Sequence, residues 1–320
     1  MDSASRPTHL RLLCLVGPTA VGKSAVALAL AGRIAGEIIS VDSMQVYRGL
    51  DIGTGKPSPA ERARVPHHLV DVAGLEESFD AARFVERTHA AVAAIEERGH
   101  RPILCGGTGL YLRAWLEGLG DAPPAAPALR AELEATPLAE LCRELETRDP
   151  ATFQRLDRAN RRRVVRALEV IRLTGRPFSP QRAAWSSGTP VTPSTRAIIL
   201  GLAREPADLR RRIDLRVEAM FAAGLVRETQ FLLEHGLAQN RTAMQAIGYR
   251  QVVEHLEGRR NLPDTIALVK SKTWQFARRQ ATWFRHQLPV TWLPVRAEES
   301  VEAVVERLLP HTTDLAGGQR

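Results

Sequence analysis

The sequence predicts an α/β fold of the P-loop NTPase type: a parallel sheet with helices on both faces, plus a small all-helical inserted domain. Short apolar segments alternate with helical segments through the first 120 residues, the order typical of such a sheet. At residues 121–127 the composition becomes rich in Pro and Ala, and the pattern is then helical to about residue 174. A strand pattern returns at residues 197–202, so a helical insertion within one α/β domain is the simplest interpretation.

The elements follow from the spacing of apolar residues. Uninterrupted apolar runs bounded by Gly, Pro or Asp predict strands, whereas apolar residues three and four positions apart predict helices. Strands are expected at residues 12–16, 37–41, 102–105, 197–202 and 290–293. Helices are expected at residues 24–31, 80–97, 110–116, 206–223, 225–235, 245–257, 263–285 and 299–309, with loops at 49–66 and 175–195. We therefore expect a catalytic core of residues 1–120 and 196–320, and an insertion of residues 121–195.

Composition limits the class of protein. A hydrophobic content of 44% supports a substantial core, and no apolar stretch is long enough to cross a membrane. The polar residues before the first strand do not resemble a signal peptide, and the three cysteines are far apart, which predicts a cytoplasmic protein with reduced thiols. No Cys or His spacing indicates zinc. The net charge of +8 is compatible with a polyanionic partner or with a merely solvated basic surface.

A phosphate-binding loop follows the first strand. Residues 17–24 match the pattern G-x-x-x-x-G-K-[ST] in the required order of strand, loop and helix. We expect the backbone N–H groups of this loop to bind a di- or triphosphate, Lys23 to neutralise it, and the Ser24 hydroxyl to hold Mg²⁺. The expected diphosphate-binding residues are Gly17, Pro18, Thr19, Ala20, Val21, Gly22, Lys23 and Ser24.

Two polar residues follow other strands. Asp42 ends the second strand, where a carboxylate can act as a general base or orient Mg²⁺ through water; the alternative is a turn cap. Thr108 lies in the segment 106–111, which is expected to offer backbone N–H groups and one hydroxyl to the same site; here the alternative is a helix cap. The carboxyl ends of parallel strands meet at one edge of a sheet, so both residues are expected near the phosphate loop.

The predicted insertion carries most of the positive charge. Residues 155–182 contain nine arginines and two acidic residues, a surplus of +7. Arg158, Arg162 and Arg166 are spaced by four, which predicts one guanidinium face on a helix. Guanidinium groups bind phosphates and stack on bases, so an RNA-facing surface is indicated, with a solvated charged face as the alternative. The apolar residues expected to pack on another face are Val164, Leu168 and Ile171.

Two later helices are also basic. Arg212 and Arg216 lie one turn apart, and either could cover a pyrophosphate from the side opposite Lys23; an ion pair with Asp208 or Glu218 is the alternative. In the segment 270–285 one stripe is apolar and is expected to face the core, whereas the role of the basic side chains stays open. That stripe consists of Trp274, Ala277, Ala281 and Phe284.

Taken together, these segments resemble the tRNA dimethylallyltransferase (tRNA isopentenyltransferase) family of bacterial type. The resemblance extends over roughly residues 10–295 and is most specific at residues 40–48 and 106–111, since the phosphate loop alone is shared with many NTPases and kinases. The other matching segments are residues 17–24, 51–57, 66–69, 163–170, 246–250 and 278–285.

The resemblance implies an activity. It implies transfer of a dimethylallyl group from dimethylallyl diphosphate to N6 of the adenosine immediately 3′ of the anticodon, in tRNAs reading codons that start with U, giving N6-dimethylallyladenosine and diphosphate. Asp42 would be the general base, and Thr108 would lie beside the diphosphate. The residues implied to bind the diphosphate with Mg²⁺ are Thr19, Lys23, Ser24 and Arg216. Those implied to contact the anticodon stem-loop are Asp42, Ser43, Met44, Gln45, Thr108, Arg130, Arg162, Arg163, Val164, Val165 and Arg166.

Three other functions compete with this interpretation. A P-loop small-molecule kinase would use the same loop for ATP, and an adenylate isopentenyltransferase would use the same chemistry on a free nucleotide. A GTPase-like RNA-binding module is disfavoured because the sequence has no Asn-Lys-x-Asp segment to read guanine. We expect a monomer that binds one tRNA and has no membrane partner.

Overall fold

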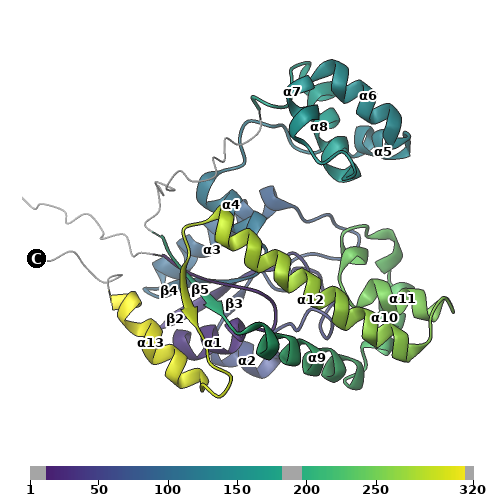
Figure 1. The fold of residues 1–320 in the computed structure, drawn as a ribbon. Coiled ribbons are helices and arrows are strands. Elements are labelled where there is room, and N and C mark those ends of the chain that lie inside the picture. Colours follow the sequence, from purple (N-terminus) through teal and green to yellow (C-terminus); the bar gives the residue numbers. More distant parts are fainter. Residues whose placement is uncertain (1–11, 182–196, 314–320) are drawn as a thin grey trace, which may run out of the picture. The chain divides into compact units, whose positions relative to one another are not determined.

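The computed structural model describes residues 12–181 and 197–313. Within these residues the chain forms two compact units, one of residues 12–116 and 197–313 and the other of residues 117–181 (Figure 1). The domain boundary that we predict at residue 195, and Arg182 with most of the predicted loop 175–195, lie outside the described residues. In the part that is described, no helix is both long and apolar enough to traverse a lipid bilayer.

The larger unit is built on a six-stranded parallel sheet, which confirms the predicted fold class. The strand order is β3-β2-β4-β1-β5-β6, so β1 lies between β4 and β5. Side chains of β1 alternate between the two faces, with Leu13 in one core cluster and Cys14 in the other. The strands are β1 (Leu12–Val16), β2 (Gly36–Val41), β3 (His67–His68), β4 (Arg101–Gly106), β5 (Ala197–Ala203) and β6 (Thr291–Pro294).

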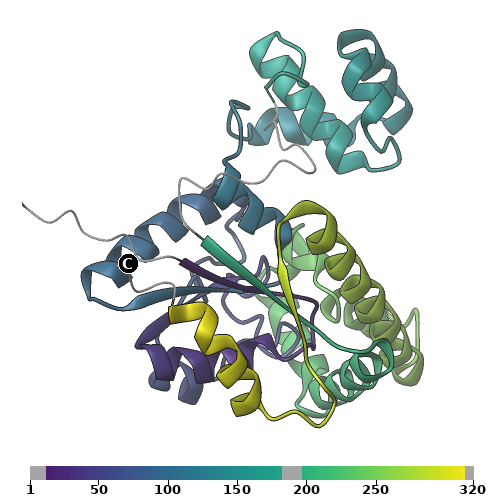
Figure 2. The same ribbon diagram turned by 60° about the vertical axis from the view of Figure 1, so that its left-hand side comes forward.

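Helices cover both faces of this sheet. On one face α1 (Lys23–Ile34) lies beside α13 (Val301–Thr313), as Figure 2 shows. On the other face α3 (Ala81–Glu97) and α4 (Gly109–Glu117) pack over β4 and β2. Four further helices of this unit are α9 (Pro206–Ala222), α10 (Leu225–Glu234), α11 (Tyr249–Leu256) and α12 (Leu262–Gln287).

Three local features differ from the sequence prediction. The predicted loop 49–66 contains a helix, α2 (Pro59–Arg64), because Ser58 and Glu61 form a reciprocal capping box. A two-residue strand, β3, extends the sheet beside β2 and is too short to give a periodic signal. The helix predicted at 245–257 is divided into a 3₁₀ turn at Ala243–Gln245 and α11, because Gly248 has a φ of +100°.

The smaller unit is all-helical. It consists of α5 (Pro127–Ala135), α6 (Leu138–Arg148), α7 (Pro150–Arg155) and α8 (Arg161–Thr174). These helices have a core of their own, formed around Leu133, Leu141, Leu145 and Leu168. The unit can therefore stabilise its helices without side chains from the sheet.

Candidate active site

The phosphate loop turns sharply between β1 and α1. Gly17 has a φ of +140°, and a Cβ there would lie 2.6 Å from the Leu202 carbonyl oxygen. Gly22 has a φ of +111° and precedes the first residue of α1. Only glycine tolerates these two positions, so the loop can wrap closely round a ligand and present the helix N-terminus to it.

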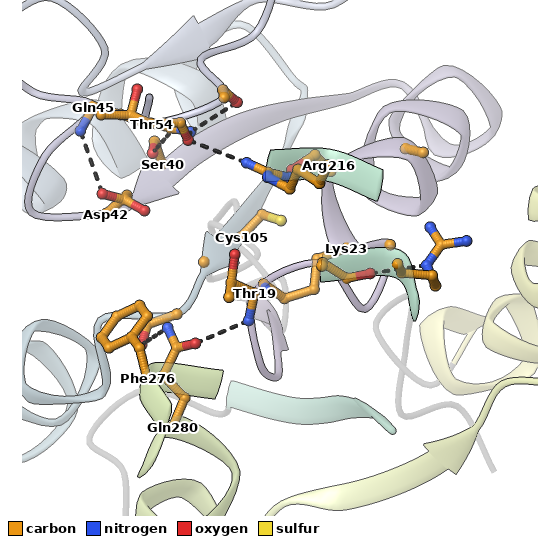
Figure 3. A pocket seen from close by; sticks show the side chains of 18 of the residues that line it. Thr19, Lys23, Ser40, Asp42, Gln45, Thr54, Cys105, Arg216, Phe276 and Gln280 are labelled. Atoms are coloured by element: carbon orange, nitrogen blue, oxygen red, sulfur yellow. Dashed lines mark hydrogen bonds between the residues drawn. The ribbon is translucent and has the colours of Figure 1, made fainter. Parts of the chain in front are cut away.

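A cavity of about 530 Å³ opens over this loop (Figure 3). Thr19, Ala20, Gly22, Lys23 and Ser24 line it, whereas Gly17, Pro18 and Val21 are buried behind it. The other walls come from the ends of β2 and β4, from residues 54–55, and from α9 and α12. They include Ser40, Asp42, Gln45, Thr54, Gly55, Cys105, Gly106, Gly107, Arg212, Arg216, Phe276 and Gln280.

Three cationic side chains of this cavity are held by backbone carbonyls. Lys23 Nζ donates to Pro18 O at 2.7 Å, Arg212 Nε to Ala20 O at 2.9 Å, and Arg216 Nη2 to Thr54 O at 3.3 Å. Burial lowers the pKa of Lys23 to about 8 and also lowers the pKa of Arg216. Asp42 attracts both cations but makes no direct ion pair with either, and a buried cation without such a partner is electrostatically costly, so the cavity favours an anionic ligand.

The alternative ion pairs considered for Arg212 and Arg216 do not form. Asp208 Oδ2 is 2.8 Å from Arg204 Nη1, and its other oxygen is 3.4 Å from Arg211 Nη2. Glu218 pairs with Lys270, which also accounts for one basic side chain of the segment 270–285. Arg212 and Arg216 therefore direct their charge at the cavity that they line.

Asp42 is both a turn cap and a cavity residue. Its Oδ1 accepts hydrogen bonds from Met44 N at 2.8 Å and from Gln45 N at 3.3 Å, as the capping interpretation requires. These two bonds leave Oδ2 as an acceptor, and the carboxylate lines the cavity. Capping fixes the carboxylate in place and is compatible with a role as a base.

Thr108 lies beside Asp42, at the end of β4. Its Oγ1 accepts a hydrogen bond from Ser43 N at 3.1 Å, so the hydroxyl proton can still be donated to a ligand. The backbone N–H groups of Gly107 and Thr108 both donate to Val41 O, at 3.2 and 3.1 Å. The expectation that these amides serve the ligand was therefore wrong, because the turn itself uses them.

A second cavity of about 310 Å³ adjoins the first. The two share Asp42 and Arg216, and Thr108, Ser43 and Met44 line only the second. Most of its remaining wall is apolar, formed by Val217, Met220, Ala246, Ile247 and Val269, while Gln245, Thr273 and Arg279 add polar groups. An anion-binding space thus borders a space suited to an apolar or flat group, and the Asp42 carboxylate lies on the wall of both.

Gln45 has a different role from the one that the resemblance implies. Its Nε2 donates to Thr54 O at 3.3 Å and to Gly55 O at 3.2 Å, and its Oε1 accepts from Ser40 Oγ at 2.8 Å. The side chain links β2 to residues 54–55 and lines only the first of the two cavities. It therefore shapes the wall of that cavity.

Sequence reasoning missed Gln280. This buried side chain of α12 accepts a hydrogen bond from Thr19 N at 2.8 Å and donates one to Gly107 O at 2.9 Å, so it joins the phosphate loop to the turn that carries Thr108. The sequence pattern that could have revealed it is a polar residue on the helical stripe of Ala277 and Phe284. Both of these residues are buried, as predicted.

The arginines of the smaller unit have unequal surroundings. Glu169 is fully buried, and its Oε2 lies 2.6 Å from Arg130 Nη2 and 2.6 Å from Arg166 Nη1. Burial opposes ionisation, but these two hydrogen bonds keep the pKa of Glu169 below its ordinary value. Arg162 and Arg163 are exposed on α8. The surface available to a ligand is therefore smaller than the charge surplus indicates.

Two predictions about this unit need correction. Val164 and Val165 belong to its core and are at most 3% exposed, so their side chains cannot contact tRNA. Arg158 precedes α8 and lies over the Phe153 ring at 5.1 Å, so it does not continue the helical face of Arg162 and Arg166.

Comparisons with known proteins agree on one family. The family described as IPP transferase matches residues 45–287. A tRNA dimethylallyltransferase of Trichlorobacter lovleyi is 47% identical over 287 residues, covering 88% of this chain and 93% of that protein. A tRNA dimethylallyltransferase of Halorhodospira halophila is 45% identical, covering 96% of this chain and 98% of that protein.

Solved structures agree as well. The full-length tRNA isopentenylpyrophosphate transferase of Bacillus halodurans is similar with a TM-score of 0.69 at 36% identity, covering 96% of this chain and 98% of that chain. A eukaryotic dimethylallyltransferase acting on tRNA is similar with a TM-score of 0.77 at 26% identity, covering 97% of this chain and 81% of that chain.

Proposed function

The chain belongs to the IPP transferase family, and we infer that it is a tRNA dimethylallyltransferase, a prenyltransferase that modifies tRNA. Its acceptor, we propose, is N6 of the adenosine immediately 3′ of the anticodon in tRNAs that read codons starting with U, and its donor is dimethylallyl diphosphate. The observation that carries the proposal is the pair of adjoining cavities, one cationic and one largely apolar, that share Asp42.

The diphosphate is proposed to occupy the cationic cavity. The amides of the phosphate loop, Lys23 and Arg216 would stabilise the charge that develops as diphosphate leaves. Mg²⁺ fits the donor set, because Ser24 and Asp42 line the same cavity and Mg²⁺ in such sites takes most of its other oxygens from phosphate and water. Its contribution would be to neutralise charge on the diphosphate. Within the described residues no cluster of three His, Cys, Asp or Glu side chains offers a protein-only metal site.

Asp42 is proposed to be the general base. The adenine amine would attack the allylic carbon, a C–N bond would form as the C–O bond to diphosphate breaks, and the amine proton would pass to Asp42. A carboxylate in this role supplies about 10²–10⁴-fold in rate. Thr108, which lines only the adjoining cavity, would donate a hydrogen bond to the end of the diphosphate that faces that cavity. Extruding the base from the anticodon loop costs a few kcal/mol, which contacts to the RNA backbone offset.

The smaller unit is proposed to bind the anticodon stem-loop. Arg162 and Arg163 are the candidate phosphate contacts, because both are exposed on α8. Arg130 and Arg166 remain predicted contacts through those guanidinium N–H groups that neither Glu169 nor, for Arg166, the Pro123 carbonyl binds. We also propose that the enzyme acts in the cytoplasm as a monomer.

Labelled dimethylallyl diphosphate with Mg²⁺ tests the function directly. We expect label to appear on unmodified tRNA and none on AMP. Label on AMP alone would identify an adenylate isopentenyltransferase. Transfer of the γ-phosphate of labelled ATP to a small-molecule acceptor, without prenyl transfer, would identify a kinase.

A further inference from the structure

The segment 51–56 lies between the cationic cavity and helices that do not line it. On the cavity side, Thr54 O accepts from Arg216 Nη2 at 3.3 Å, and the carbonyls of Thr54 and Gly55 both accept from Gln45 Nε2. The position of the Arg216 guanidinium thus depends on where this loop lies. We call residues 51–56 the carbonyl loop.

Two polar side chains hold the opposite side of the carbonyl loop. Glu228, on α10, accepts a hydrogen bond from Ile52 N at 2.9 Å, and Tyr249, on α11, accepts one from Gly53 N at 3.1 Å. The Tyr249 hydroxyl in turn donates to Glu228 Oε1 at 2.6 Å. Neither Glu228 nor Tyr249 lines either cavity. Their polar groups are therefore directed at the backbone of the loop.

At Gly53 and Gly55 the backbone of the carbonyl loop is in close contact with neighbouring side chains on both of its sides. A Cβ at Gly53 would overlap the Tyr249 ring, and a Cβ at Gly55 would overlap the Arg216 guanidinium. Gly55 also has a φ of +59°, a backbone conformation that residues other than glycine rarely adopt. The loop is thus packed directly between Tyr249 and Arg216, with no side chain of its own in either contact.

We propose that Glu228 and Tyr249 are positioning residues that place Arg216 for the diphosphate through the carbonyl loop. The proposal rests on the proposed function only in naming the diphosphate as the ligand. Fixing the loop determines where the Thr54 carbonyl lies, and that carbonyl determines where the guanidinium lies. A charged donor that is displaced by even a small distance binds its anion less tightly. Removing the hydrogen bonds of Glu228 and Tyr249 should therefore lower the affinity of the site for diphosphate.

The test removes one hydroxyl. In Tyr249→Phe we expect the Kd for inorganic diphosphate, measured by calorimetry, and the KM for dimethylallyl diphosphate to rise about 3- to 30-fold, while the Kd for tRNA stays unchanged. Glu228→Gln keeps an acceptor for Ile52 N and should raise both constants by a smaller factor. Tyr111→Phe is the matched control, since the Tyr111 hydroxyl is also buried and donates to a backbone carbonyl, Phe79 O, away from this loop.

A double-mutant cycle separates positioning from a purely structural role. In an Arg216→Ala background, Tyr249→Phe should no longer change the Kd for diphosphate, because the group that it positions is gone. Additive effects of the two substitutions would overturn the proposal. The proposal would also be overturned if Tyr249→Phe left the Kd for diphosphate unchanged and only lowered the melting temperature, as much as Tyr111→Phe does. The cycle uses diphosphate binding alone, so failure of prenyl transfer to tRNA would count against the proposed function and leave this inference intact.

Discussion

The cationic cavity and helix α8 are both rich in basic side chains, but their cations have different partners. In the cavity, Lys23, Arg212 and Arg216 donate to backbone carbonyls, and the Asp42 carboxylate acts on Lys23 and Arg216 through longer-range attraction and not through a direct ion pair. In the smaller unit, Arg166 pairs with buried Glu169, and Arg172 pairs with both Glu132 and Glu144. A cation held by carbonyls can bind an incoming anion at full charge, whereas a cation held by an acid stabilises the fold.

The largest effect is expected from removing the Asp42 carboxylate, the anionic group that lies beside these cations where the two cavities meet. Asp42→Asn keeps an oxygen that can cap Met44 N but cannot accept the proton, so kcat should fall about 10²–10⁴-fold with little change in tRNA affinity. Single-turnover transfer and tRNA binding measure the two effects. Asp80→Asn makes the same change at the N-cap of α3 and should leave kcat unchanged. Loss of tRNA affinity with normal kcat would disprove the role of Asp42 as a base.

Two arginine substitutions compare the regions directly. Arg216→Ala should weaken diphosphate binding about 10- to 100-fold, because a hydrogen bond to a charged group contributes about 1.5–3 kcal/mol, and should change the melting temperature little. Arg166→Ala should leave diphosphate binding unchanged and destabilise the smaller unit by about 1–3 kcal/mol, because buried Glu169 loses one of its two arginines. Calorimetry and thermal unfolding report the two quantities. The contrast would be refuted if Arg216→Ala mainly lowered stability and Arg166→Ala mainly weakened diphosphate binding.

The protonation of Lys23 should make both the affinity for diphosphate and the free energy of unfolding depend on pH. Its folded pKa of about 8 is below the ordinary value of 10.5, so diphosphate affinity should fall above pH 8, by at most about tenfold per pH unit. Over the same window the unfolded chain binds more protons than the folded one, so the contribution of Lys23 to the free energy of unfolding rises with pH. Lys23→Met should abolish both trends. A diphosphate affinity that is flat from about pH 7 to 10 would contradict this expectation.

The smallest expected effect concerns the exposed arginines. Replacing Arg162 and Arg163 with Gln should weaken tRNA binding several-fold and lower the slope of log K against log salt by about 1 for each phosphate that these side chains neutralise. Filter binding over a range of salt concentrations measures the slope. An unchanged slope would mean that these side chains form only a solvated face.

Residues close to a strand end could be predicted from the sequence. The phosphate loop and Asp42 directly follow a strand, Thr108 lies two residues after the end of one, and a parallel sheet brings such ends together. The fold class followed from the same alternation. Helix α2 was missed because six residues carry too little periodicity, although its capping box was visible at Ser58 and Glu61.

Residues that act through long-range contacts could not be found in this way. Gln280 bonds to Thr19 across 261 positions, and Tyr249 bonds to Gly53 across 196. The burial of Glu169 between two arginines was equally hidden, because composition counts charges and does not report which acid lies beside them. Such pairings depend on tertiary packing, which a one-dimensional pattern does not contain.

The central place of β1 has a kinetic consequence. Strand β1 is hydrogen-bonded to β4 on one side and β5 on the other, and all five of its residues are buried, so its amides can exchange with solvent only in a large opening of the sheet. The carbonyl loop is not part of the sheet, and its outer side is fixed by the hydrogen bonds that Ile52 N and Gly53 N donate to the Glu228 and Tyr249 side chains. In deuterium exchange, β1 should therefore be among the slowest segments, while the loop amides of Ile52 and Gly53 should exchange earlier and slow down when diphosphate is added.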